Sequence, residues 1–277
     1  MSINQQPYKN SDGLYVFVVT SCKGGIGKST VCANLAVALA NAGRRVLCVD
    51  CDYSNRSLDL IFGVDCKLAP GIDRYIYEKL EPAAVLMKIR EDRLWFIPGP
   101  EKGRILFTRD EFMARVRDAA LFNKCDTVLI DTPGASDGIL PVVAPLADTG
   151  IVVASHMPTS IRGAEKTGKM LAELGVEERF LIVNRFDAHA VLAGIRPGVN
   201  DLIDQTYIRL IGVVPDSKTL ELAQEDGILA DEIAKDRDRT ADAFAEIADR
   251  LLGGRKPLMS YLPAGMRKRL TKPKKQQ

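Results

Sequence analysis

A glycine-rich loop between an expected strand and an expected helix constrains the fold of this chain more than any other stretch. Residues 18–30 read VVTSCKGGIGKST. The apolar run at 14–19 is too short for a helix and is typical of a strand buried on both faces. Residues 29–42 carry apolar side chains at helical spacing, with Gly43 just beyond them. The order strand, glycine loop, helix predicts a loop that wraps around an anion at a helix N-terminus.

The loop matches the Walker A pattern of nucleotide-binding proteins at all positions but one. Its backbone N–H groups are expected to surround the β-phosphate of ATP, where the helix dipole favours anions. Lys28 is expected to reach the β- and γ-phosphates as a catalytic group, and the Ser29 hydroxyl to bind Mg²⁺. The predicted cofactors are therefore ATP and Mg²⁺. The loop residues predicted to contact the nucleotide of their own subunit are Gly24, Gly25, Ile26, Gly27, Lys28, Ser29 and Thr30.

Two residues at the entrance of the loop depart from a simple phosphate-binding turn. Cys22 stands where the full pattern has glycine, and Lys23 adds a second lysine five residues before Lys28. The pattern K-G-G-x-G-K-S resembles the deviant Walker A of the MinD/ParA class of ATPases. This resemblance implies that Lys23 is catalytic across a dimer interface, where it touches the ATP of the partner subunit, and that the chain forms an ATP-dependent homodimer.

Apolar strand patterns and amphipathic helix patterns alternate along the chain. Short strands followed by helices predict an α/β fold with a doubly wound, mostly parallel sheet flanked by helices, as in P-loop NTPases. Ligands of such sheets bind at the carboxyl ends of the strands. Beyond the first pair, the expected strands are residues 45–50, 94–98, 127–131, 150–155, 180–184 and 210–214, and the expected helices are residues 109–122, 162–174, 217–224 and 240–252.

Acidic residues follow two of the expected strands. Asp50 and Asp52 form a D-x-D at the end of residues 45–50, where alternate residues of an extended segment share a face. The next stretch, R-S-L-D-L at 56–60, resembles the MinD branch of the family, which implies that Asp52 is a catalytic residue orienting the attacking water and that residues 55–60 form a switch contacting regulators. Asp131 ends the run TVLID and is predicted to be the Walker B carboxylate that holds Mg²⁺ together with Ser29.

Polar residues after two later strands are assigned through the resemblance. Asn184 and Arg185 end the run LIVNRF, and Pro215 and Asp216 end IGVVPDS. In MinD-like proteins the matching positions line the base pocket, and the Asn184 amide has the donor and acceptor needed to bind an adenine edge.

Composition fits one large domain with a basic C-terminal end. The chain has 277 residues, 46% of them hydrophobic, and a net charge of +2. Residues 255–277 carry eight Lys or Arg and no acid, so the remainder, with 30 basic and 36 acidic residues, has a net charge of −6. We expect a flexible N-terminus at 1–13, an ATPase domain at 14–254 and a basic tail at 255–277. No apolar run approaches 18 residues, which favours a cytoplasmic protein with reduced cysteines.

The tail supports two readings. Apolar residues recur every four positions and would share one side of a helix, and the basic residues around them would favour an anionic membrane surface. Pro263 and Gly265 interrupt such a helix. A solvated basic tail, or a contact with DNA, therefore stands beside a membrane anchor that would hold the protein on the inner face of the cell membrane. The apolar residues are Leu258, Leu262, Met266 and Leu270.

By resemblance, the chain is an ATP-dependent dimerising switch whose slow hydrolysis is stimulated by a protein regulator and which positions the division apparatus at the membrane. A flagellar-number regulator of the same family and a ParA-like DNA-partition ATPase are the alternatives. An iron-protein reductase of the same fold would need cluster-binding cysteines after the Walker B aspartate, and residues 131–143, DTPGASDGILPVV, contain none. A small-molecule kinase would not need Lys23.

Overall fold

The protein is built around one eight-stranded sheet. The computed structural model describes residues 13–53, 55–66, 69–100, 107–134 and 138–271, so the expected flexible terminus at 1–13 lies outside it except for Gly13. The strand order is β3-β4-β2-β5-β1-β6-β7-β8. Every pair is parallel except β3 with β4, which is antiparallel. The predicted doubly wound, mostly parallel sheet is confirmed.

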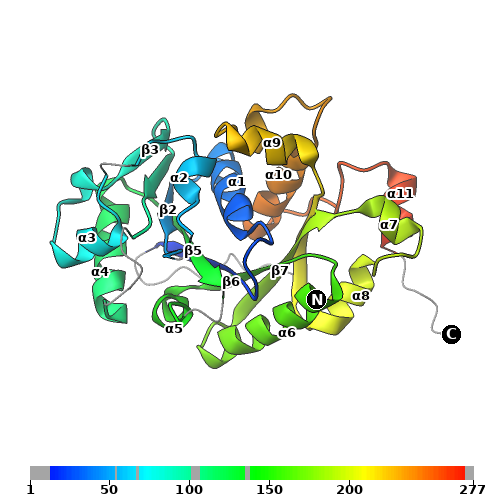
Figure 1. The fold of residues 1–277 in the computed structure, drawn as a ribbon, viewed down its shortest axis with the longest axis horizontal. Coiled ribbons are helices and arrows are strands. Elements are labelled where there is room, and N and C mark those ends of the chain that lie inside the picture. The colour runs from blue at the N-terminus through cyan, green and yellow to red at the C-terminus, as the bar shows by residue number, and fades with distance from the viewer. Residues whose placement is uncertain (1–12, 54, 67–68, 101–106, 135–137, 272–277) are drawn as a thin grey trace.

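Helices cover both faces of this sheet (Figure 1). One face packs against α1, α9 and α10, and the other against α4, α5, α6 and α8. Central strands are buried along their whole length because apolar side chains on both of their faces meet helices. The helices on the first face are α1 (Lys28–Asn41), α2 (Leu58–Ile61), α9 (Lys218–Glu225) and α10 (Thr240–Leu251), and those on the second are α3 (Ile72–Tyr77), α4 (Arg109–Phe122), α5 (Leu140–Val143), α6 (Pro158–Glu173) and α8 (Val199–Thr206).

Each strand expected from the sequence is present, with ends moved by a few residues. The strand β7 is longer by two residues at each end, and β5 continues past Asp131 to Gly134. Sequence patterns missed the edge strand β3 and the short helices α2, α3, α5 and α8, because so few residues often give too little periodicity to recognise. The strands are β1 (Tyr15–Ser21), β2 (Val46–Asp50), β3 (Met87–Arg90), β4 (Leu94–Ile97), β5 (Thr127–Gly134), β6 (Thr149–Ala154), β7 (Glu178–Phe186) and β8 (Arg209–Pro215).

The C-terminal segment returns to the body of the protein as far as residue 271. Met259 is fully buried and Leu270 is almost so, and both belong to the core on the α6 face of the sheet. The Tyr261 hydroxyl donates to the carbonyl of Val213 on the edge strand β8 at 3.0 Å. Helix α11 (Ala264–Leu270) begins only after Pro263 and lies beside α7 (Ala188–Leu192) (Figure 1). The apolar residues whose spacing suggested one amphipathic helix therefore lie partly in a turn and partly in the short helix α11.

Residues 272–277, the last part of the expected basic tail, lie outside the described residues. Among the residues that the structure does describe, no helix has the length and apolar character needed to cross a bilayer.

Candidate nucleotide-binding site

A cavity of about 400 Å³ opens at the carboxyl ends of the central strands, where the predicted loop, the D-x-D and the end of β5 meet. The parallel sheet explains this convergence, because β1, β2 and β5 are neighbours and their carboxyl ends lie at one edge. The residues that line the cavity are Cys22, Lys23, Gly24, Gly25, Gly27, Lys28, Ser29, Thr30, Asp52, Asn55, Ser57, Ile61, Pro133, Gly134 and Arg185.

The loop needs glycine where its backbone turns. Gly25 and Gly27 have φ angles of +74° and +83°, values that L-residues with side chains rarely adopt. A Cβ on Gly27 would also lie 2.3 Å from Nδ2 of Asn184. That same amide nitrogen donates to the carbonyl of Ile26 at 2.9 Å. Asn184 thus holds the loop from β7, a contact that the base-pocket assignment did not include.

Lys28 lies at the centre of the site and is 6% exposed. Its Nζ is 2.9 Å from Oδ1 of Asp131 and 3.6 Å from Oδ2 of Asp52. Burial alone would lower the pKa of Lys28, but the two carboxylates together raise it. The lysine therefore stays charged, and in the absence of nucleotide it neutralises the acids that surround it.

Two buried carboxylates face this lysine. Burial raises the pKa of Asp131, and the charge of Lys28 and the hydrogen bond from Ser29 act in the opposite direction. The pKa of Asp50 is raised well above its usual range, first by burial and then by the charge of Asp131. The Oδ2 atoms of Asp50 and Asp131 are buried without a hydrogen-bond partner among the described residues. Such orphaned carboxylate oxygens next to a serine hydroxyl fit Mg²⁺, which prefers oxygen ligands.

Asp52 stands at the wall of the cavity, 8% exposed. Its backbone N–H donates to Oδ1 of Asp50 at 2.8 Å, and its own Oδ1 accepts from the backbone N–H of Asn55 at 3.0 Å. The D-x-D is thus a hydrogen-bonded turn that fixes the direction of the Asp52 carboxylate. The predicted switch continues from this turn into α2.

The two lysines of the loop have opposite environments. Lys23 is exposed at the mouth of the cavity, and no described residue forms an ion pair with it. Lys28 is buried and paired. Of these two lysines, Lys23 is the one whose ammonium group has no ion-pair partner among the described residues.

A smaller cavity of about 40 Å³ lies on the other side of Gly27, between the loop, β7 and α9. All four residues predicted for the base pocket, Asn184, Arg185, Pro215 and Asp216, line it. Sequence reasoning missed the contribution of α9, whose Gln224 amide accepts a hydrogen bond from the Thr30 hydroxyl at 3.2 Å. No motif marks Gln224, and only the three-dimensional contact reveals it. The remaining lining residues are Gly27, Thr30, Val214, Ser217, Leu220, Glu221 and Gln224.

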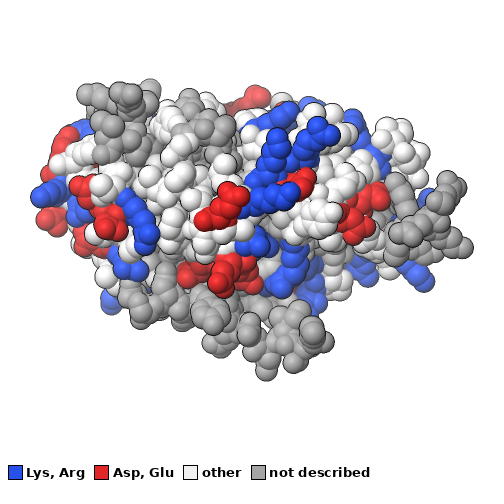
Figure 2. Space-filling view, turned by 90° about the horizontal axis from the view of Figure 1, so that it is seen from below, with Lys and Arg blue, Asp and Glu red and all other residues white. Residues whose placement is uncertain are grey.

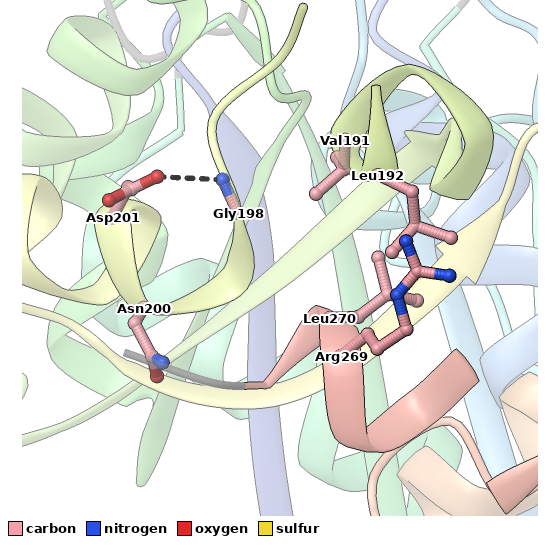
Figure 3. Close-up of a pocket in the computed structure, with 7 residues that line it drawn as sticks. All are labelled: Val191, Leu192, Gly198, Asn200, Asp201, Arg269 and Leu270. Carbon is pink, nitrogen blue, oxygen red and sulfur yellow. Dashed lines mark hydrogen bonds between the residues drawn. The ribbon is translucent and has the colours of Figure 1, made fainter. Parts of the chain in front are cut away.

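Another cavity, of about 350 Å³, lies far along the sheet where α11 meets α7 and α8 (Figure 3). Its wall is part apolar and part charged, with the Arg269 guanidinium next to Leu192 and the Asp201 carboxylate accepting from the Gly198 N–H at 2.8 Å. It contains no glycine loop and no lysine, so it does not have the features of a phosphate site. Its lining is Val191, Leu192, Gly198, Asn200, Asp201, Arg269 and Leu270.

Comparisons with known proteins agree with this geometry. Residues 17–230 match the model of the CobQ/CobB/MinD/ParA nucleotide-binding domain. The septum site-determining protein MinD of Bacillus subtilis is 32% identical over 254 residues, covering 87% of this chain and 90% of the relative. MinD of Synechocystis is 29% identical and covers 90% of this chain and 93% of its own. The MinC:MinD cell division protein complex of Aquifex aeolicus contains a chain with a TM-score of 0.80 and 26% identity, covering 88% of this chain and 98% of that one.

Proposed function

The chain belongs to the CobQ/CobB/MinD/ParA family of nucleotide-binding domains, and we propose that it is a MinD-like ATPase that dimerises with ATP and returns to monomers after hydrolysis. Family membership supports nucleotide binding and ATP hydrolysis. The named relatives act in septum site determination and cell division. The proposed role of this protein is therefore to position the division apparatus.

Each residue of the site would have its own role in ATP binding and hydrolysis. Lys28 would leave its ion pair with Asp131 to bind the β- and γ-phosphates, and the N–H groups of residues 24–28 would hold the β-phosphate. Asp52, fixed by its turn, would orient the water that attacks the γ-phosphorus. Ser29 and Asp131 would hold Mg²⁺, which supplies charge neutralisation when bound. Asn184, Arg185, Pro215 and Asp216 would contact the base.

The observation that carries the dimer proposal is the separation of the two lysines. Lys28 already has carboxylates within its own subunit, whereas Lys23 is exposed at the mouth of the same cavity without a described ion-pair partner. A cation in that position is available to the ATP of a second subunit. Since each copy would contribute its Lys23 to the other, the arrangement is self-complementary, as a two-fold dimer requires.

Sizing chromatography with phosphate release tests the proposal. The unchanged protein should elute as a dimer in Mg·ATP and as a monomer in Mg·ADP. Lys23→Ala should still bind ATP but should neither dimerise nor hydrolyse it, and Asp52→Ala should remain an ATP-bound dimer. Lys166→Ala, at an exposed lysine of α6, is the matched control and should behave like the parent. Normal dimerisation and hydrolysis by Lys23→Ala would refute the role across the interface.

A protein regulator that stimulates hydrolysis is part of the proposal, because one of the similar structures is a MinC:MinD complex. The switch at residues 55–60 would contact it. A cytoplasmic location with peripheral membrane binding is also proposed, and its anchor would be the basic segment from Arg267 onward.

The DNA-partition alternative has less support from the surface. Figure 2 shows a face of the protein on which Lys and Arg side chains stand beside Asp and Glu. On α6, Arg162, Lys166 and Lys169 are exposed, and Glu165 lies 2.7 Å from the Lys169 ammonium group. Mixed charges attract a polyanion less than a continuous basic stripe does. A flagellar-number regulator would share the same site, and imaging a fluorescent fusion in dividing cells separates these roles by location.

A further inference from the structure

The entrance of the phosphate loop is packed directly against helix α6. A Cβ built on Gly163 would lie 2.1 Å from Sγ of Cys22 and 2.6 Å from Cβ of Cys22. Both distances are far below van der Waals contact, so the Cys22 side chain occupies the space that any side chain at position 163 would need. Gly163 is buried in the first half of α6, which itself packs against β1.

The backbone does not explain this glycine. Gly163 is inside a regular helix and is not among the residues with positive φ. Glycine in a helix interior costs about 1 kcal/mol relative to alanine. Among the described residues, the feature of position 163 that requires glycine is therefore the approach of Cys22.

Cys22 is also unusual among the cysteines. The other five are buried, whereas Cys22 is partly exposed and lines the phosphate cavity. The hydroxyl of Ser21 donates to the carbonyl of Lys23 at 2.8 Å, so a hydrogen bond closes the turn around Cys22. The cysteine side chain is thus held between α6 on one side and the loop on the other, next to the lysine proposed to act across the dimer.

We propose that Cys22 and Gly163 form a matched steric pair that sets the conformation of the phosphate loop at its entrance, and with it the position of Lys23. Cys22 is a positioning residue in this inference, and its thiol takes no part in chemistry. The loop has a cysteine side chain at position 22, where the Walker A pattern has glycine. In return, helix α6 has a glycine at position 163, which leaves room for that side chain. The inference rests on the proposed function, because nucleotide binding is its readout.

Gly163→Ala tests the pair. Rotation about χ1 can move Sγ of Cys22 away from the new methyl group, but it cannot move Cβ, so the backbone at Cys22 must shift. We expect at least a tenfold increase in the Kd for a fluorescent ATP analogue. Cys22→Gly should weaken binding by only about threefold, because the loop loses the side chain that fixes its entrance but is not pushed out of place. The double variant Cys22→Gly/Gly163→Ala should bind within threefold of Cys22→Gly.

Gly168→Ala is the matched control on the same helix. Its Cβ would lie 2.7 Å from Cδ1 of Ile208, the end of a side chain that can rotate, and Cys22 is not among the atoms near it. We expect a lower thermal midpoint but an unchanged Kd. If Gly163→Ala likewise changes only the midpoint, the pair is merely structural and the inference fails. It also fails if the double variant does not recover binding.

Thiol labelling separates this inference from the proposed function. Because the other five cysteines are buried, a thiol reagent such as Ellman's reagent should react first with Cys22. Gly163→Ala should change that labelling rate at least threefold even without nucleotide, since the methyl group displaces the thiol. If the parent protein does not bind ATP, the proposed function fails while the labelling result still decides the pair. An unchanged labelling rate overturns it.

Discussion

Replacing Lys28 by methionine should destabilise the nucleotide-free protein, apart from any effect on ATP. The ammonium group is 2.9 Å from Oδ1 of Asp131, whose side chain is fully buried, and 3.6 Å from Asp52. Methionine keeps most of the volume of the lysine stem but removes the charge. The Asp131 carboxylate then loses its closest counter-charge while its other oxygen already lacks a described partner.

Breaking a buried ion pair by removing one partner costs about 3–5 kcal/mol. We expect the lower end of that range, because burial already raises the pKa of Asp131 and the carboxyl group can take up a proton when Lys28 is gone. When folding raises the pKa of a carboxyl group, the free energy of unfolding decreases as the pH rises through that range, because the charged form is disfavoured in the folded protein. The penalty of Lys28→Met should therefore be largest at neutral pH and shrink as the pH falls.

Urea unfolding without nucleotide at pH 7 and pH 5 measures the effect. Lys28→Met/Asp131→Asn should be less destabilised than Lys28→Met alone, since the buried Asp131 carboxylate without its counter-charge is gone, and this coupling isolates the pair. Lys23→Met is the control for lysine replacement in the same loop, and its effect should stay within about 0.5 kcal/mol because Lys23 is exposed. If Lys28→Met unfolds at the same free energy as the parent at pH 7, the reasoning is wrong.

Three further outcomes are expected. Asp50→Asn should raise the stability of the nucleotide-free protein more at pH 7 than at pH 4.5 in urea unfolding, because burial raises the pKa of Asp50 and the charged form is the costly one; an equal gain at both pH values would contradict this. Leu270→Ala should cost about 2–5 kcal/mol by the same measurement, since Leu270 is a buried core residue, and a change under 0.5 kcal/mol would show that α11 is not docked in solution. Vesicle co-sedimentation in Mg·ATP should depend on anionic lipid and weaken in high salt, whereas equal binding to neutral vesicles would exclude an electrostatic anchor.

Motif spacing predicted which residues of the candidate site lie together. The residues of the site lie in or after three strands that are separate in sequence, and the rule that parallel strands present their carboxyl ends at one edge brings them together. They are Lys28 and Ser29 after β1, Asp52 after β2 and Asp131 in β5. The structure places the Lys28 ammonium group 2.9 Å from Asp131 and 3.6 Å from Asp52. Local rules of this kind succeed because a strand followed by a glycine loop and a helix has few conformations open to it.

Contacts between elements that carry no motif could not be predicted. Gly163 reads in the sequence as a weak point in a helix, and only the position of α6 beside the loop shows that Cys22 requires it. Gln224 is an ordinary helix residue until α9 brings it to Thr30. In both cases the partner lies more than 100 residues away, beyond the reach of periodicity or composition.

The contacts of the C-terminal segment could not be predicted from the sequence either, and they bear on how the protein would bind a membrane. Apolar residues four positions apart predict that one side is buried, but they do not say against what. Here Met259 and Leu270 are buried against the body, and moving them into a bilayer would exchange one apolar environment for another with little net gain from burial. The balance would then rest on Arg267, Lys268 and Arg269, each worth about 1 kcal/mol near an anionic leaflet. One copy would gain about 3 kcal/mol, which is marginal, and a dimer with two copies would gain twice that. Membrane binding by this protein would therefore follow dimerisation and lipid charge rather than the apolar face of α11.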